Sequence, residues 1–147
     1  MAAGEPSPTP GALVWRLAMK WRAAVDRAVA PIGLTHAQYS LLASLYGMVR
    51  AGKRPSQREL ADYTGLETIY VSKLARTLEQ SGLIVRAGNP NDTRAVQLDL
   101  TAVGRKRIVQ GIAVVHDLLE ELTEPLGGTK SDRTRAFTQT LQALLDA

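Results

Sequence analysis

The chain has 147 residues, of which 45% are hydrophobic and 22% are charged, with a net charge of +4 and no cysteine. This length and composition are those of one globular domain with a core of its own. The absence of cysteine excludes disulfides, thiolate metal sites and thiol-based redox sensing. No apolar run reaches the ~18 residues that a membrane-spanning helix requires.

The first ten residues, MAAGEPSPTP, combine Glu5 with three prolines. A secretory signal would begin with basic residues followed by an apolar segment, and this stretch has neither. We therefore interpret residues 1–10 as a disordered lead-in and residues 11–147 as a single domain. The expected location is the cytoplasm.

Helical spacing of apolar residues predicts four helices in the first half of the chain. Thr35 and Gln38 form a capping-box sequence that begins the second of them. Gly65 and Gly82 are stop signals for the third and the fourth. The predicted helices cover about 12–30, 35–52, 56–65 and 68–81.

Residues 88–101 interrupt the helical pattern. The sequence GNPNDTR contains turn-forming residues and one arginine, Arg94, and the residues after it alternate between apolar and polar or small. This pattern predicts a β-hairpin. Thr101 then caps a fifth helix that reaches about Thr123, and a sixth helix follows EPLGGTKS.

A short helix, a turn, a second helix and a hairpin together form a winged helix-turn-helix. The predicted fold is therefore mainly α with a small β-hairpin wing. Residues 34–100 would form the winged helix-turn-helix, and residues 11–33 and 101–147 would form dimerisation helices. The polar loop is then the wing, and Arg94 is placed to meet a DNA backbone or minor groove.

Positive charge is concentrated in this middle part of the chain. From Arg50 to Arg107 there are 11 lysines and arginines and 6 acidic residues, a net charge of +5, whereas the remainder carries −1. A local basic excess favours an anionic partner such as a nucleic acid. Charge alone is also compatible with a solvated surface.

The fourth helix has two unlike faces. The side expected to pack on the core carries Val71, Leu74, Ala75 and Leu78. The opposite side carries Ile69, Ser72, Lys73, Arg76 and Gln80. In a major groove, the isoleucine suits a thymine methyl and the basic side chains suit guanine acceptors. The residues expected to contact phosphates are Gln57, Thr68, Tyr70 and the lysine. The alternative is a solvated face with one stray isoleucine.

Three stretches resemble the MarR family of bacterial transcriptional regulators: LTHAQYSLL, ELADYTGLETIYVSKLARTLEQSGLIVR and NPNDTRAVQLDLTAVGR. The resemblance implies that Arg94 enters a minor groove, that Asp92 braces the wing by pairing with a nearby basic side chain, and that the fourth helix reads a major groove. It also implies a dimer that usually represses and is released from DNA by small, often phenolic, molecules. The chain departs from the family in having Ile69 and Tyr70 where small hydroxyl residues are usual. It also has Glu67 where a Ser or Asp cap is common, so that Thr68 would cap instead or the helix start would fray.

The fifth helix supports a dimer independently of this resemblance. Eight of the twelve residues from Ile108 to Leu119 are apolar. Apart from Val114, these residues and Leu122 cover well over half of the helix circumference. Such a helix must be buried against more than one layer, and a second chain would supply one of them. We therefore expect a symmetric homodimer on a roughly palindromic operator, with half-sites ~10 base pairs apart.

The position of a ligand pocket follows from the resemblance, which places it between the dimerisation helices and the winged domain. Its candidate lining residues are Trp15, Trp21, Tyr39 and His116. His116 lies within the apolar arc of the fifth helix, which indicates a packed or interface histidine, with a role as a pocket residue or metal ligand as the alternative. His36 is interpreted as part of a capped helix start. Two isolated histidines give no metal-binding spacing, and neither a metal site nor a cofactor is predicted.

The function predicted is that of a sequence-specific DNA-binding regulator, and no enzyme activity is expected. Two alternatives remain: a winged helix that binds protein, which the basic middle segment disfavours, and a metal-responsive regulator.

Overall fold

The computed structural model describes residues 4–89 and 91–147, with the backbone alone for residues 89 and 92–95. Residues 4–9 are exposed and have no helix or strand. The first helix, α1 (Pro10–Val29), begins two residues earlier than expected, because Thr9 accepts a hydrogen bond from the Ala12 amide and proline occupies the first helical position.

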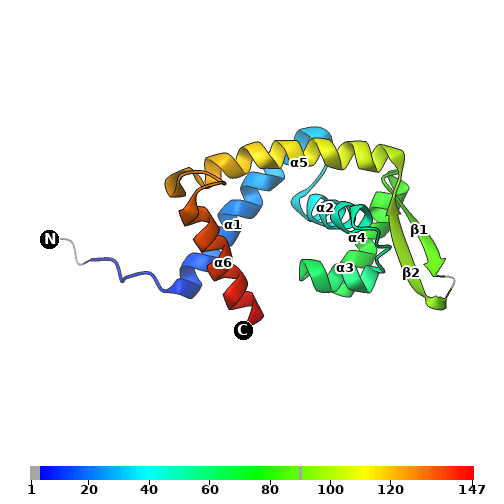
Figure 1. Ribbon diagram of the computed structural model, residues 1–147, viewed down its shortest axis with the longest axis horizontal. Helices are drawn as coiled ribbons and strands as arrows, with labels where there is room; N and C mark the ends of the chain where they lie inside the picture. Colours follow the sequence, from blue (N-terminus) through cyan, green and yellow to red (C-terminus); the bar gives the residue numbers. More distant parts are fainter. Residues whose placement is uncertain (1–3, 90) are drawn as a thin grey trace.

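The winged domain is built from short elements in the predicted order (Figure 1). A 3₁₀ turn, η1 (Ala30–Ile32), leads into α2, and the elements that follow are α2 (His36–Arg50), α3 (Gln57–Thr64), α4 (Thr68–Gln80), β1 (Ile84–Asn89) and β2 (Asp92–Leu100). Capping boxes begin α2 and α3, with Thr35 paired to Gln38 and Ser56 paired to Glu59. The mainly α fold with a two-stranded wing is confirmed.

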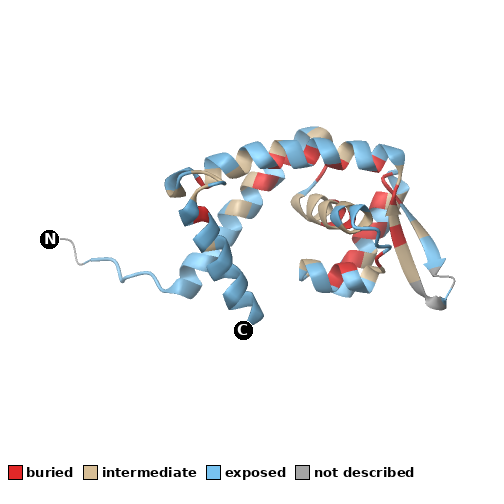
Figure 2. Cartoon of the chain, in the orientation of Figure 1, coloured by how far each residue is buried: buried red, intermediate tan, exposed pale blue. Residues whose placement is uncertain are grey.

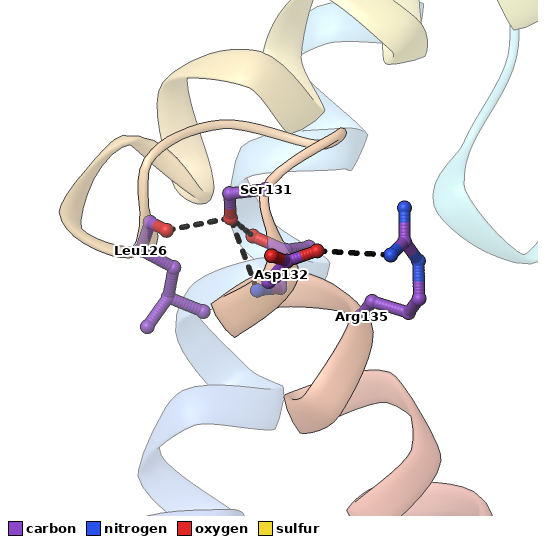
Figure 3. Close-up of polar contacts among 5 residues, drawn as sticks. Leu126, Ser131, Asp132 and Arg135 are labelled. Carbon is purple, nitrogen blue, oxygen red and sulfur yellow. Dashed lines mark hydrogen bonds and ion pairs between the residues drawn. The ribbon is translucent and has the colours of Figure 1, made fainter.

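The long helix α5 (Ala102–Leu122) runs across the whole molecule and packs on α1 and α2 (Figure 1). After the 3₁₀ turn η2 (Glu124–Leu126), the chain reverses into α6 (Asp132–Asp146). Ser131 fixes this reversal, because its hydroxyl donates to the Leu126 carbonyl at 2.6 Å and accepts from the Thr134 amide at 3.1 Å (Figure 3). Asp132 and Arg135 add an ion pair on the first turn of α6.

One hydrophobic core joins α2, α3, α4 and the wing to the adjoining parts of α1 and α5. Its completely buried members include Leu42, Leu60, Val71 and Ile108. Figure 2 shows that buried residues gather in the winged domain, whereas the far ends of α1 and α6 are exposed. A single chain therefore completes the core of the winged domain and leaves the α1–α6 end uncovered.

The start of α5 is held against the end of the helix-turn-helix by a very close backbone approach. A Cβ atom on residue 104 would lie 1.8 Å from the Leu83 carbonyl oxygen, which is far too close. Only glycine, which has no Cβ atom, fits at this position. The Thr101 amide donates to the same carbonyl at 3.1 Å, and the Thr101 hydroxyl donates to the Gly82 carbonyl at 2.6 Å. The threonine that caps α5 thus also attaches this helix to the residues that follow α4.

Candidate nucleic-acid interface

The helix-turn-helix consists of α3 and α4 joined by three residues. Gly65 ends α3 with a φ of 76°, in the left-handed region that glycine adopts without strain. The chain can therefore turn sharply and begin α4 at Thr68. Gln57 is half-buried in the first turn of α3.

The two faces of α4 are as the sequence predicts. Val71, Leu74, Ala75 and Leu78 are buried, and the opposite side leaves exposed Ile69, Lys73, Arg76 and Gln80. Ile69 is 71% exposed, although transfer of an isoleucine out of water is favourable by about 1.5–3 kcal/mol. Ser72 is half-buried on the flank, and Thr68 and Tyr70 are exposed in the first turn. The helix therefore presents one apolar, two basic and one amide side chain in a single row.

The wing is an antiparallel pair in which Ile84 lies opposite Leu100 and Gly88 lies opposite Val96. The register shifts between Gly88 and Asn89, so the hairpin is irregular toward its tip. The backbone of Asp92 and Arg94 belongs to β2, but their side chains lie outside the described part of the chain. Their expected roles, bracing the wing and entering a minor groove, remain predictions.

Two ion pairs connect the wing to the helices beside it, and sequence reasoning missed both. Arg86 on β1 lies 3.1 Å from Glu79 on α4, and the hydrogen bond from this arginine holds the pKa of the Glu79 carboxyl below its usual value. Arg54, between α2 and α3, lies 2.9 Å from Asp99 on β2. The partners are seven and 45 residues apart, so no helical or strand spacing signals either pair.

The loop before α3 also pairs with the wing through its backbone. The Leu98 amide donates to the Pro55 carbonyl at 2.9 Å, and Ser56 forms an isolated antiparallel bridge with Gln97. The wing therefore has the loop before α3 beside β2 and α4 beside β1. Its orientation relative to α4 is determined by contacts on both strands.

The N-terminus of α4 has no side-chain cap, unlike the N-termini of the other α-helices. Glu67 occupies the N-cap position and makes no side-chain hydrogen bond to the helix. The expectation that Thr68 caps in its place is wrong, because Thr68 is already the first helical residue. Hydroxyl caps are present at Thr9, Thr35, Ser56, Thr101 and Ser131. The first turn of α4 lacks a contribution of about 1 kcal/mol that such a cap makes.

The four residues expected to line a ligand pocket lie in different surroundings in the single chain, and their joining in one pocket remains a prediction. Trp15 is 66% exposed near the start of α1, and Trp21 lines an apolar groove between α1 and α6. Tyr39 on α2 packs against Gly111 of α5, and burial raises the pKa of its hydroxyl. The side chain of His116 is 62% exposed in the single chain, so of the two expectations, a packed or an interface histidine, the interface one remains a prediction. The apolar arc of α5 extends beyond the surface that α1 and α2 cover.

A different cavity, of about 180 Å³, lies where α1, α2, α3 and α4 meet. Its walls are formed by Arg22, His36, Ala37, Ser40, Thr64, Leu66 and Tyr70. His36 is the first residue of α2, as expected from the capped start, and its amide donates to Asp26 Oδ1 at 2.8 Å. Burial, and next the charge of Arg22, hold the pKa of its imidazole below the ordinary value, against the opposing effect of Asp26.

The groove between α1 and α6 is larger, about 450 Å³, and almost entirely apolar. Its lining residues are Pro10, Leu13, Val14, Leu17, Ala18, Trp21, Phe137, Thr140, Leu141 and Leu144. Leu144 is 66% exposed, and α6 makes little contact with the other helices of its own chain. This end of the molecule therefore exposes a contiguous apolar surface of the kind that marks interaction sites.

Within the described part of the chain, no three or more histidine, aspartate and glutamate residues lie together as potential metal ligands. None of the helices formed by these residues combines the length and the apolar character needed to span a bilayer.

Comparison with known proteins places this geometry in context. Residues 32–95 match the sequence profile of the MarR family. The chain is 35% identical over 113 residues to YdcH, an uncharacterised HTH-type transcriptional regulator of Bacillus subtilis (strain 168), and the match covers 77% of each chain.

Two solved structures show the same fold over nearly the whole chain. One is a mutant of MarR from E. coli in complex with operator DNA, with 26% identity, a TM-score of 0.79 and 92% of each chain covered. The other is a transcriptional regulator of the MarR family from Rhodococcus sp. RHA1, with 28% identity, a TM-score of 0.79, and 91% of this chain and 90% of that one covered.

Proposed function

Because the chain belongs to the MarR family of DNA-binding transcriptional regulators, we propose that it is a homodimeric repressor that binds a palindromic operator and leaves it when a small phenolic ligand binds. The observation that carries this proposal is the exposed row Ile69, Lys73, Arg76 and Gln80 on α4, which lies beside a wing fixed by two ion pairs.

Each part of this surface suits a different feature of DNA. In the major groove, Ile69 would contact a thymine methyl, and Lys73 or Arg76 would donate to guanine acceptors. Backbone phosphates would be contacted by Gln57, Thr68 and Tyr70, which position the protein without reading sequence. Arg94 would enter the minor groove from the wing, with Asp92 bracing the hairpin.

The partner that fits the α1–α6 groove is a second copy of the chain. The groove is apolar, α6 has little support within its own chain, and burial of each leucine on dimerisation would contribute about 1.5–3 kcal/mol. A symmetric dimer would present two α4 helices to one face of a duplex, so its half-sites would lie ~10 base pairs apart.

The cavity where α1, α2, α3 and α4 meet supports ligand-controlled release. Its lining offers a guanidinium from Arg22, a hydroxyl from Ser40, and apolar surface from Ala37 and Leu66. The Thr64 hydroxyl already donates to the Leu60 carbonyl. This combination suits a small anion that carries a ring, such as an ionised phenol or aromatic acid.

Fluorescence anisotropy on DNA from directly upstream of the protein's own gene, with unrelated competitor and across a salt series, tests the function. Binding that survives competitor is expected, and phenolic compounds are then screened for release. Binding that competitor abolishes would mean that the operator lies elsewhere. A lack of binding at low salt would reject the assignment of α4 and the wing, and it would favour a winged helix that binds protein.

A further inference from the structure

A pocket of about 460 Å³ lies where the turn of the helix-turn-helix meets the beginning of α4. Its lining residues are Gly65, Leu66, Glu67, Ile69, Tyr70 and Lys73. Two of them, Ile69 and Lys73, belong to the exposed row that is proposed to face the major groove. The pocket is therefore at the end of α4 that, in helix-turn-helix proteins, contacts the edges of bases.

Glu67 adds a hydrogen-bond acceptor to this pocket. It is exposed, occupies the N-cap position of α4 and makes no side-chain hydrogen bond to the helix. It takes part in none of the ion pairs that the described residues form with one another. A carboxylate, which only accepts hydrogen bonds, thus lines the same pocket as the apolar side chain of Ile69 and the ammonium group of Lys73.

These three side chains match the major-groove edge of one base pair. Cytosine presents an amino donor at N4, and its guanine partner presents acceptors at O6 and N7. The carboxylate of Glu67 suits the amino donor, and the ammonium group of Lys73 suits the guanine acceptors. The atom next to C4 on the same edge of cytosine is C5, which carries a methyl group in 5-methylcytosine. Ile69 suits a methyl group at this position as it suits that of thymine.

We propose that Glu67, Ile69 and Lys73 read a base pair between 5-methylcytosine and guanine, so that cytosine methylation in the operator strengthens binding. The inference rests on the proposed function and adds a means of regulating it. Contact with the methyl group would remove it and part of Ile69 from water, which is favourable for both. Ile69 alone does not distinguish 5-methylcytosine from thymine, because both carry a methyl group at C5. Glu67 makes this distinction, since thymine has an acceptor, O4, where cytosine has its amino donor.

Synthetic duplexes test the effect of the methyl group directly. The wild-type protein first selects sequences from a random pool in which every cytosine carries the C5 methyl group. Each 5-methylcytosine of the selected sequence is then replaced, in both half-sites, by cytosine or by thymine paired with adenine, and dissociation constants are measured by anisotropy. At one position in each half-site, loss of the two methyl groups should weaken binding about tenfold. Thymine at that position should weaken binding about thirtyfold or more.

Two variants separate the two contacts. Ile69→Ala should bring methylated and unmethylated duplexes to within about twofold of each other and keep the preference for cytosine over thymine. Glu67→Gln should keep the methyl effect and lower the preference for cytosine over thymine to less than about threefold, because an amide accepts from cytosine or donates to thymine. Val103→Ala, at an exposed position on α5 outside the pocket, is the control and should change neither ratio.

Melting curves confirm that the variants fold, as expected for exposed side chains. Equal affinity for methylated and unmethylated duplexes at every position, or a selected sequence without 5-methylcytosine, would overturn the inference. A methyl effect that survives Ile69→Ala would also overturn it, as would a preference for cytosine that Glu67→Gln leaves unchanged. These outcomes leave the proposed function intact, because the protein still binds the selected duplex. If it selects no duplex from methylated or unmethylated pools, the proposed function itself fails, and this inference fails with it.

Discussion

Arg86 on β1 and Glu79 on the last turn of α4 form an ion pair with 3.1 Å between Nη2 and Oε1. It joins the first strand of the wing to the helix proposed to read DNA. Both side chains are partly exposed, so the pair is worth more as a positional constraint than as a source of stability.

Glu79→Gln should remove this constraint in a pH-dependent way. The pKa of Glu79 lies below its ordinary value of 4.5, chiefly because Arg86 hydrogen-bonds to the ionised form. A carboxyl group with a depressed pKa stabilises the folded protein fully when the pH is above its pKa in the unfolded chain. This stabilisation is lost as the pH falls through its pKa in the folded protein. The wild type should therefore be the more stable protein at pH 7, and the difference should shrink below pH 4.5 and vanish once the pH falls below the folded pKa of Glu79. Urea unfolding across this range measures it, with Glu121→Gln, on the exposed surface of α5, as the control.

Gly104→Ala should destabilise the protein by about 3 kcal/mol or more, because the new methyl group would overlap the Leu83 carbonyl. Gly47→Ala is the matched control. Gly47 lies inside α2 with open space around its Cα, so the same methyl group should stabilise the helix by about 0.5–1 kcal/mol. Thermal or urea unfolding of the two variants should give opposite signs, and a stable Gly104→Ala protein would contradict the close contact.

The His36→Gln variant should lose less stability than the wild type when the pH is lowered. The pKa of His36 is depressed in the folded protein, first by burial and then by Arg22. At a pH between this folded pKa and the unfolded pKa, the imidazole is protonated in the unfolded chain but not in the folded one. Stability of the wild type should fall as the pH drops through the unfolded value of 6.5, and level off below the folded pKa. Unfolding measured from pH 8 to pH 5 should show a smaller slope for His36→Gln. His116→Gln makes the same change at a largely exposed position of α5 and serves as the control.

Arg94→Ala and Arg76→Ala should impair DNA binding in different ways. Loss of a wing contact to the backbone should weaken binding to all sequences and flatten the log–log salt dependence by about 0.9 per lost phosphate contact. Loss of a base contact from α4 should relax the preference at one position by about 1–3 kcal/mol. Anisotropy titrations on the operator and on single-base variants distinguish the two. Identical behaviour would show that this division of roles is wrong.

Leu144→Glu should convert the proposed dimer into a monomer, because it places a charge in the apolar groove between α1 and α6. Val85→Glu introduces the same charged side chain at an exposed position on β1 and should leave the dimer mass of the protein in solution unchanged. Light scattering at micromolar concentration gives the mass of each variant. A monomeric wild type would reject the dimer directly.

Local patterns in the sequence were sufficient for most of the fold. The capping box at Thr35 located the start of α2, and helical spacing separated the buried and exposed faces of α4. These features depend on residues within one or two turns of each other, which periodicity reports directly.

The residues of the cavity where α1, α2, α3 and α4 meet depend on how helices distant in sequence pack, and the sequence carries no local signal for that. Arg22, Ser40 and Tyr70 come from three helices. The candidates Trp15 and His116 came instead from a pocket position that the family resemblance implies. The ion pairs of Glu79 with Arg86 and of Arg54 with Asp99 were missed for the same reason.

The Gly104–Leu83 contact has a mechanical consequence. Together with the hydrogen bonds of Thr101 to the Gly82 and Leu83 carbonyls, it joins the first turn of α5 to the residues that follow α4. We therefore expect the winged domain and the first turn of α5 to rotate as one body. The 21 residues of α5 form a lever about 30 Å long at 1.5 Å per residue. A tilt of roughly 5° at its far end, near α6, would carry α4 through about 2–3 Å, comparable to the spacing of successive base pairs. Small repacking at the α1–α6 end would therefore displace α4 relative to the DNA that we propose it binds.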